Sequence, residues 1–201
     1  VNLIPRFDDV TEGEILMDGV DVREVRQHDL REKIGYVPQK GILFSGTSAS
    51  NLRYADEDAS EAELQRAIAI AQAAEVVGSK PEGLATDISQ GGTNVSGGQR
   101  QRLSIARALV KQAPVYIFDD TFSALDFKTD AALRRALYTH THDSTMLVVT
   151  QRVSTVKQAE QIIVLDKGRM VGKGTHEELM EKCETYQEIA LSQLSMEELS
   201  S

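Results

Sequence analysis

A chain of 201 residues is long enough for one large domain or two small lobes with a buried core. Its 41% hydrophobic and 26% charged residues are those of a soluble globular protein, and no apolar run approaches the ~20 residues that span a bilayer. The formal charge of −9 argues against a general nucleic-acid-binding surface. The single cysteine, Cys183, excludes an intrachain disulfide and favours a reducing compartment.

The first fifty residues predict a small β region followed by a buried strand. Val1–Ile4 is typical of the middle of a helix without a cap, so we expect the chain to start inside a larger protein. Ile15–Val22 is a hairpin pattern with Asp18-Gly19 at its turn. Ile34–Val37 is predicted to be a strand that stops before a proline. Gln39 then follows, where its amide could reach a metal or an attacking water, or could simply be a surface turn residue.

Residues 51–95 predict a small helical lobe inserted between core elements. The stretch 56–74 is rich in Ala, Glu and Gln, and Ser60 and Glu63 have the spacing of a capping box. An apolar stripe follows at helical spacing and consists of Leu64, Ala67, Ile68 and Ala71.

The stretch Ser96-Gly97-Gly98-Gln99 predicts a glycine-rich turn that opens directly into a helix from Arg100 to about Val110. Its glycines lack the Cβ atoms that would keep an anion from the backbone. The first-turn N–H groups and the helix dipole favour negative charge there. The alternative is an ordinary helix cap by Ser96.

Two adjacent acids follow a continuous apolar strand. Val115–Phe118 is typical of a parallel strand covered on both faces, and Asp119-Asp120 stands at its carboxyl end, where open α/β sheets bind ligands. Such acids can hold Mg²⁺ and polarise an attacking water. The alternative is an acidic turn that caps the next element.

The remaining third of the chain predicts one more buried strand and a hairpin. Ser123–Asp126 precedes a helix from about Lys128 to Tyr138. Thr145–Thr150 is predicted to be a buried strand with Gln151 at its tip, and Gln161–Gly172 to be a hairpin.

In this order, these motifs resemble the nucleotide-binding domain of an ABC transporter. Tyr36-Val37-Pro38-Gln39 and Leu43–Thr47 are most similar to multidrug, peptide and lipid exporters. The resemblance implies an α/β, P-loop NTPase-like (RecA-like) parallel-sheet core with a small antiparallel β region and an inserted helical subdomain. The implied divisions are 1–50 for the core lobe with the β region and Q-loop, 51–95 for the helical subdomain, and 96–201 for the signature helix and the rest of the core.

The resemblance also implies the cofactors ATP and Mg²⁺ and a role for each motif. Gln39 is implied to be the Q-loop residue, which contacts magnesium and nucleotide and senses the transmembrane coupling helices. Asp119 corresponds to the Walker B magnesium acid. The implied nucleotide-binding residues are Gln39, Ser96, Gly97, Gly98, Gln99 and Asp126, the last in the D-loop.

Three departures from the family pattern matter. The phosphate-binding loop G-x-x-x-x-G-K-[ST] is absent, so we expect the chain to begin just after it and to lack the N-terminal strand. We also expect it to bind ATP poorly or not at all and to be monomeric in solution. Asp120 replaces the catalytic glutamate and is one methylene shorter. Gln151 replaces the switch histidine and cannot titrate near neutral pH.

Both catalytic replacements together resemble the degenerate half of a heterodimeric exporter. Asp120 and Gln151 would then serve a slow site of this chain, and Ser96–Gln99 would complete the site of a second, different nucleotide-binding chain. A transmembrane domain fused upstream and a place at the cytoplasmic face of the cell membrane are also implied. The alternatives are a soluble ABC ATPase without transport duty and an inactive docking subunit.

Overall fold

The computed structural model describes residues 1–200, with side chains described through residue 193. The chain divides into two compact units, Val1–Val149 and Thr150–Ser201. The predicted domain boundaries at 50 and 95 lie inside the first unit and stay predictions.

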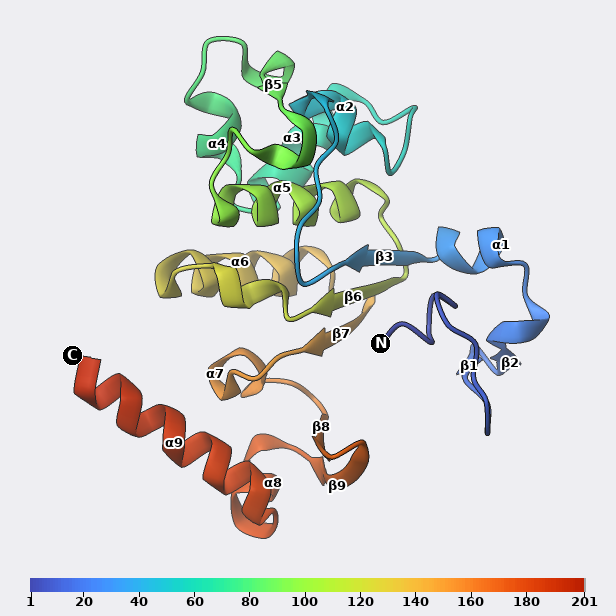
Figure 1. Ribbon diagram of the computed structural model, residues 1–201, viewed down its shortest axis with the longest axis vertical. Coiled ribbons are helices and arrows are strands. Elements are labelled where there is room, and N and C mark those ends of the chain that lie inside the picture. The colour runs from blue at the N-terminus through green and yellow to red at the C-terminus, as the bar shows by residue number, and fades with distance from the viewer. Residues whose placement is uncertain (201) are drawn as a thin grey trace. The chain divides into compact units, whose positions relative to one another are not determined.

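A parallel three-stranded sheet forms the centre of the first unit (Figure 1), which confirms the predicted α/β class. Its order is β3 (Ile34–Val37), β6 (Val115–Asp119) and β7 (Thr145–Val149). The register pairs Val37 with Phe118 and Asp119 with Val149, so the carboxyl ends of all three strands lie at one edge. That edge is where ligands bind in open α/β sheets.

Strand β7 is less buried than its sequence predicts. Its two end residues, Thr145 and Val149, are exposed and the three between them are half-buried. In the part of the chain that the structure describes, β7 pairs with β6 alone and is therefore an edge strand. A continuous apolar run indicates a fully buried strand only where both faces of the sheet are covered, and β7 is at most half-buried, so the prediction of a buried strand is wrong here.

Helix α5 (Gly97–Val110) packs against the helices that precede it in sequence. Figure 1 shows α2 (Ser48–Arg53), α3 (Glu61–Ile70) and α4 (Ala74–Gly78) gathered on its side away from the sheet. The predicted stripe of α3 is 2% exposed or less at every position, and the Ser60–Glu63 capping box is present. Short strands β4 (Gly46–Thr47) and β5 (Asp87–Ile88) pair antiparallel, and the turns η2 (Gly83–Ala85) and η3 (Gln90–Gly92) complete this region.

The predicted N-terminal hairpin is confirmed. Strands β1 (Leu16–Met17) and β2 (Val20–Asp21) pair antiparallel across Asp18 and Gly19. Both turn residues have positive φ, 53° and 80°, as the mirror-image turns of two-residue hairpins require. The short helices η1 (Val22–Glu24) and α1 (Gln27–Glu32) lead from the hairpin to β3.

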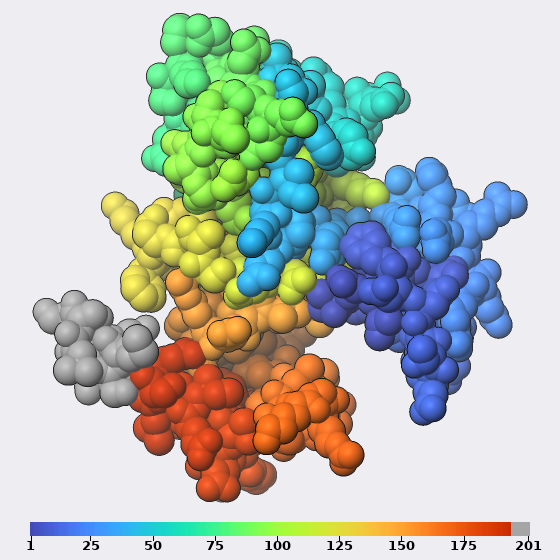
Figure 2. Space-filling model, viewed as in Figure 1, coloured from blue at the N-terminus to red at the C-terminus, as the bar shows by residue number. Residues whose placement is uncertain are grey.

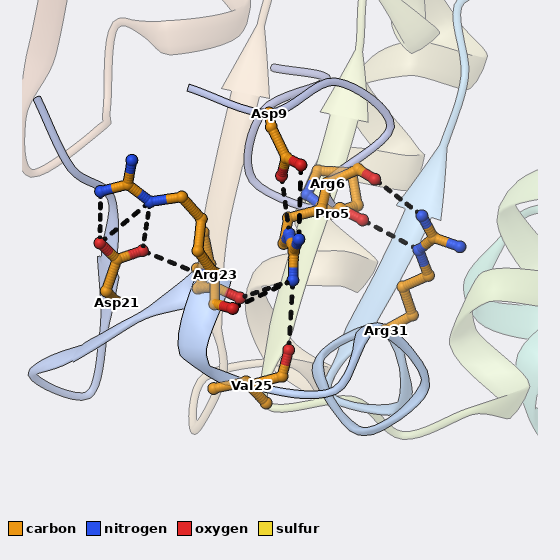
Figure 3. Close-up of polar contacts among 8 residues, drawn as sticks. Pro5, Arg6, Asp9, Asp21, Arg23, Val25 and Arg31 are labelled. Carbon is orange, nitrogen blue, oxygen red and sulfur yellow. Dashed lines mark hydrogen bonds and ion pairs between the residues drawn. The ribbon is translucent and has the colours of Figure 1, made fainter. Parts of the chain in front are cut away.

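The first residues form hydrogen-bonded turns, so the prediction of a helix at Val1–Ile4 is wrong. Pro5 has no N–H to continue a helix, and Arg6 has a left-handed φ of 53°. Figure 3 shows what holds these turns: Arg31 donates to the carbonyl oxygens of Pro5 and Arg6 at 2.9 and 2.8 Å. Arg6 in turn donates to carbonyl oxygens of residues 22, 23 and 25.

The second unit contains the hairpin predicted near residues 161–172 and has its own small core. It consists of α7 (Val153–Val156), β8 (Ile162–Asp166), β9 (Arg169–Gly174), α8 (His176–Lys182) and α9 (Glu184–Ser200). Its core residues are Ile162, Val164, Leu179, Cys183 and Tyr186. Among the described residues, no helix combines the length and apolarity needed to cross a membrane.

Candidate functional site

Two hydrogen-bonded pairs of side chains lie at the carboxyl edge of the central sheet, and we call them the strand-end site: Tyr36 with Asp119, and Gln39 with Asp120. The Gln39 Nε2 atom donates to Asp120 Oδ2 at 3.0 Å across 81 residues of sequence. The Tyr36 hydroxyl donates to Asp119 Oδ2 at 3.3 Å. Desolvation, and then the nearby Asp119 charge, raise the pKa of Tyr36, so its hydroxyl stays a donor at neutral pH.

The backbone around Asp120 is held in an unusual conformation. Its φ of 44° and ψ of 32° are left-handed, a region that Asp tolerates better than most residues. The Asp120 N–H donates to Val149 O at 2.8 Å, and Ser123 Oγ donates to Asp120 O at 2.8 Å. Thr121 Oγ1 donates to Val37 O at 3.2 Å. The ends of all three strands therefore hold the backbone at Asp120 and Thr121 in place.

The donor set of the strand-end site suits a hard cation. The contact between Gln39 and Asp120 uses the amide nitrogen and leaves the amide oxygen of Gln39 available as a ligand. Mg²⁺ takes one or two protein carboxylates and completes its shell with water and phosphate oxygens. Within the described residues, no group of three or more His, Cys, Asp or Glu could hold a metal by itself.

The turn Ser96–Gln99, the signature turn, begins α5 with a complete capping box. Gln99 N donates to Ser96 Oγ at 3.2 Å, and Ser96 N donates to Gln99 Oε1 at 2.9 Å. The capping box does not use the N–H groups of Gly97 and Gly98. A Cβ built on Gly97 meets no atom within 4 Å, so an anion can approach this end of the helix.

The segment Ser123–Asp126 lies beside the start of α5. A Cβ built on Gly98 would stand 3.4 Å from the carbonyl oxygen of Ala124. Asp126 caps α6 (Phe127–His140) by accepting from Thr129 N at 2.9 Å, and this hydrogen bond lowers the pKa of Asp126. Its predicted contact with nucleotide stays a prediction.

Gln151 lies in the second unit, where its side chain is exposed. Its carbonyl oxygen accepts from Gln193 Nε2 at 2.5 Å. Its predicted catalytic role stays a prediction.

Sequence reasoning singled out neither Tyr36 nor Gln101 as part of the site. Gln101 is 2% exposed, and its amide bonds the segment that carries Gln39. The available signal was its position four residues before Ile105, on the buried side of the helix pattern. Figure 2 shows the segment that follows β3 running over the surface of the first unit towards the helical region.

Three kinds of comparison place the chain among known proteins. A family model described as "ABC transporter" matches residues 1–123. An uncharacterized ABC transporter ATP-binding protein of Mycobacterium bovis is 50% identical over 196 residues, covering 96% of this chain and 33% of that protein. An ATP-dependent lipid A-core flippase of Desulfotalea psychrophila is 42% identical over 186 residues, covering 92% and 32%.

A solved structure agrees with these relatives. A bacterial Atm1-family ABC exporter with ATP bound has a TM-score of 0.93 and 36% identity, covering 96% of this chain and 34% of that one. The chain thus spans about a third of the length of the relatives it matches. Because the family model covers more than half of its residues, the chain belongs to the ABC transporter family.

Proposed function

We propose that this chain couples ATP binding and hydrolysis to export across a membrane, as the slow half of an unequal pair of nucleotide sites. The observation that carries the proposal is the 3.0 Å contact between Gln39 and Asp120, set beside an intact signature turn. The Gln39–Asp120 contact belongs to this chain's own nucleotide site, and the signature turn contributes to the nucleotide site of another chain.

The slow rate follows from Asp120. Its side chain is a methylene shorter than glutamate, and its carboxylate is engaged with Gln39. When a catalytic base is displaced by about an ångström from its productive position, the rate falls on the order of a hundredfold. Gln151 can accept or donate a hydrogen bond but cannot carry a positive charge near neutral pH.

Nucleotide binding at the strand-end site needs a phosphate cradle besides these residues. The 201 residues contain no G-x-x-x-x-G-K-[ST] sequence, so they supply magnesium ligands and a water-orienting carboxylate but no such cradle. Asp119 and Gln39 would hold Mg²⁺, which supplies charge neutralisation at the phosphates when bound. The role of Asp120 is to orient and deprotonate water.

The signature turn completes the site of a second nucleotide-binding domain on a different chain. The N–H groups of Gly97 and Gly98 and the dipole of the 14-residue α5 favour a phosphate of the nucleotide that the partner holds. The intact capping box around Ser96 keeps this helix start ordered for that purpose.

The other proposed partner is a transmembrane domain, which this chain would contact at the cytoplasmic face of the cell membrane. Just beyond Gln39, the first unit exposes Ile42 at 55%, Phe44 at 43% and Tyr54 at 70%. The Phe44 and Tyr54 rings lie 4.7 Å apart, which gathers apolar surface beside the Gln39 segment. A relative named as a lipid A-core flippase supports a lipid or other amphiphilic cargo over a polar one.

Steady-state ATPase of the full-length protein, alone and with its candidate partner, tests the proposal. We expect low turnover alone and high turnover in the pair. Brisk turnover alone would show that Asp120 and Gln151 suffice and that the protein works as a homodimer. ATPase without any membrane domain would favour a soluble ABC ATPase, and absence of ATP binding would favour a docking subunit.

A further inference from the structure

We propose that Gln101 is a positioning residue that ties the Gln39 segment to the signature helix, so that the two halves of the nucleotide machinery move together. The inference rests on the proposed ATPase function. It concerns a side chain that contacts neither the strand-end carboxylates nor the signature turn.

The side-chain amide of Gln101 forms hydrogen bonds with the backbone on both sides of Gln39. Its Nε2 donates to the carbonyl oxygen of Pro38 at 3.1 Å, and its Oε1 accepts from the N–H of Gly41 at 2.8 Å. Only Gln39 and Lys40 lie between these two points, and both are exposed. We call these two hydrogen bonds the Gln101 clamp. The clamp fixes the ends of a two-residue segment and leaves its side chains free to reach a ligand.

Burial makes the clamp rigid. Gln101 is 2% exposed and Gly41 is buried, so water cannot take over either hydrogen bond at low cost. Gly41 also fits tightly, because a Cβ there would lie 3.0 Å from Gln101 Oε1 and 3.1 Å from the carbonyl oxygen of Arg100. The segment therefore follows α5 when α5 moves.

The clamp connects two sites through one helix. Gln101 is two residues after Gln99, on the first turns of the helix that Ser96 caps. Gln39 in turn donates to Asp120. A displacement of the signature turn is thus carried through Gln101 to Gln39 and on to the Asp120 carboxylate. We expect Gln101 to matter for turnover more than for ATP affinity.

A double-mutant cycle on the full-length protein, assembled with its partner, tests this inference. Gln101→Met keeps the volume and removes both hydrogen bonds, and Gln65→Met is the matched control, an exposed glutamine on α3. The kcat meant here is that of this chain's own site, measured as single-turnover ATPase, and we expect Gln101→Met to lower it about tenfold with little change in ATP binding. Added to Gln39→Ala, it should lower kcat no further, because it acts through Gln39.

Effects that multiply in the double variant, or wild-type kcat in Gln101→Met, would overturn the inference. Absence of ATPase activity in the unsubstituted assembly would count against the proposed function instead. Wild-type kcat in Gln39→Ala would overturn both, because the inferred coupling runs through Gln39. If Gln101→Met does not fold, Gly41→Ala is the substitute, because its Cβ would crowd Gln101 Oε1 and disturb the clamp. It should give the same loss of kcat.

Amide hydrogen exchange gives a readout besides activity. We expect exchange of the Gly41 N–H to speed up at least about tenfold in Gln101→Met and to stay unchanged in Gln65→Met. Unchanged protection of Gly41 would show that the clamp does not hold this segment, and the inference would fail.

Discussion

The strand-end site and the signature turn differ in how their polar groups are used. At the strand ends, Gln39 bonds Asp120 and Tyr36 bonds Asp119, so side chains engage one another across long stretches of sequence. At the signature turn, the side chains of Ser96 and Gln99 each accept a hydrogen bond from the other residue's backbone N–H, and Gly97 faces open space. The strand-end site is held together by contacts between this chain's own side chains. The signature turn leaves the start of α5 open to a ligand.

This difference separates a site that needs tertiary structure from one that needs only a helix start. Three parallel strands must pair in register before Gln39 and Asp120 can meet. A capping box and two glycines suffice for the signature turn. Variants that affect the two regions unequally can therefore test whether they serve different nucleotides.

The largest expected effect is at Asp119. Asp119→Asn keeps the shape but removes the charge that would hold Mg²⁺, which contributes several kcal/mol to the transition state. We expect hydrolysis at this chain's own site to fall about a hundredfold or more in the assembled protein, measured as single-turnover ATPase. An unchanged rate in Asp119→Asn would contradict the metal assignment.

Ser96→Arg should come next in size and should act on the partner's site. A bulky cation at the signature turn displaces the cap and blocks the anion-binding helix start, and we expect ATPase of the pair to fall about a hundredfold. Ser60→Arg is the matched control, because Ser60 has the same capping box on α3. The control should lose about 1 kcal/mol of stability and keep ATPase.

Restoring the family's residues should act in the opposite direction. The double substitution Asp120→Glu with Gln151→His lengthens the base and adds a titratable ring. We expect this chain's own site to gain about tenfold or more in turnover, measured without the partner. No gain would mean that the slow rate has a cause other than these two residues.

The smallest effect concerns pH. The N–H of Thr129 holds the pKa of Asp126 below 3.8, so its cap stabilises the fold above that pH and is lost as pH falls through the lowered value. Asp126→Asn keeps an oxygen for the cap but does not titrate there. We expect the stability of the variant to depend less steeply on pH below about 4, as read by urea denaturation.

Local features of the fold were predictable from the sequence, and long-range partners were not. Capping boxes and the Asp18-Gly19 turn depend on neighbours a few residues apart, and all are present. The edge position of β7 depends on which strands pair, so its exposure was missed. The Gln101 clamp joins residues 60 and 63 positions apart, and nothing in the periodicity of α5 identifies its partners.

Nucleotide trapping in the assembled pair shows which chain's nucleotide the signature turn serves. A photoreactive ATP analogue with vanadate labels whichever chain holds the hydrolysed nucleotide. With Ser96→Arg in this chain, we expect trapping on the partner chain to be lost while this chain still binds ATP. Loss of trapping on this chain, with trapping on the partner preserved, would contradict it.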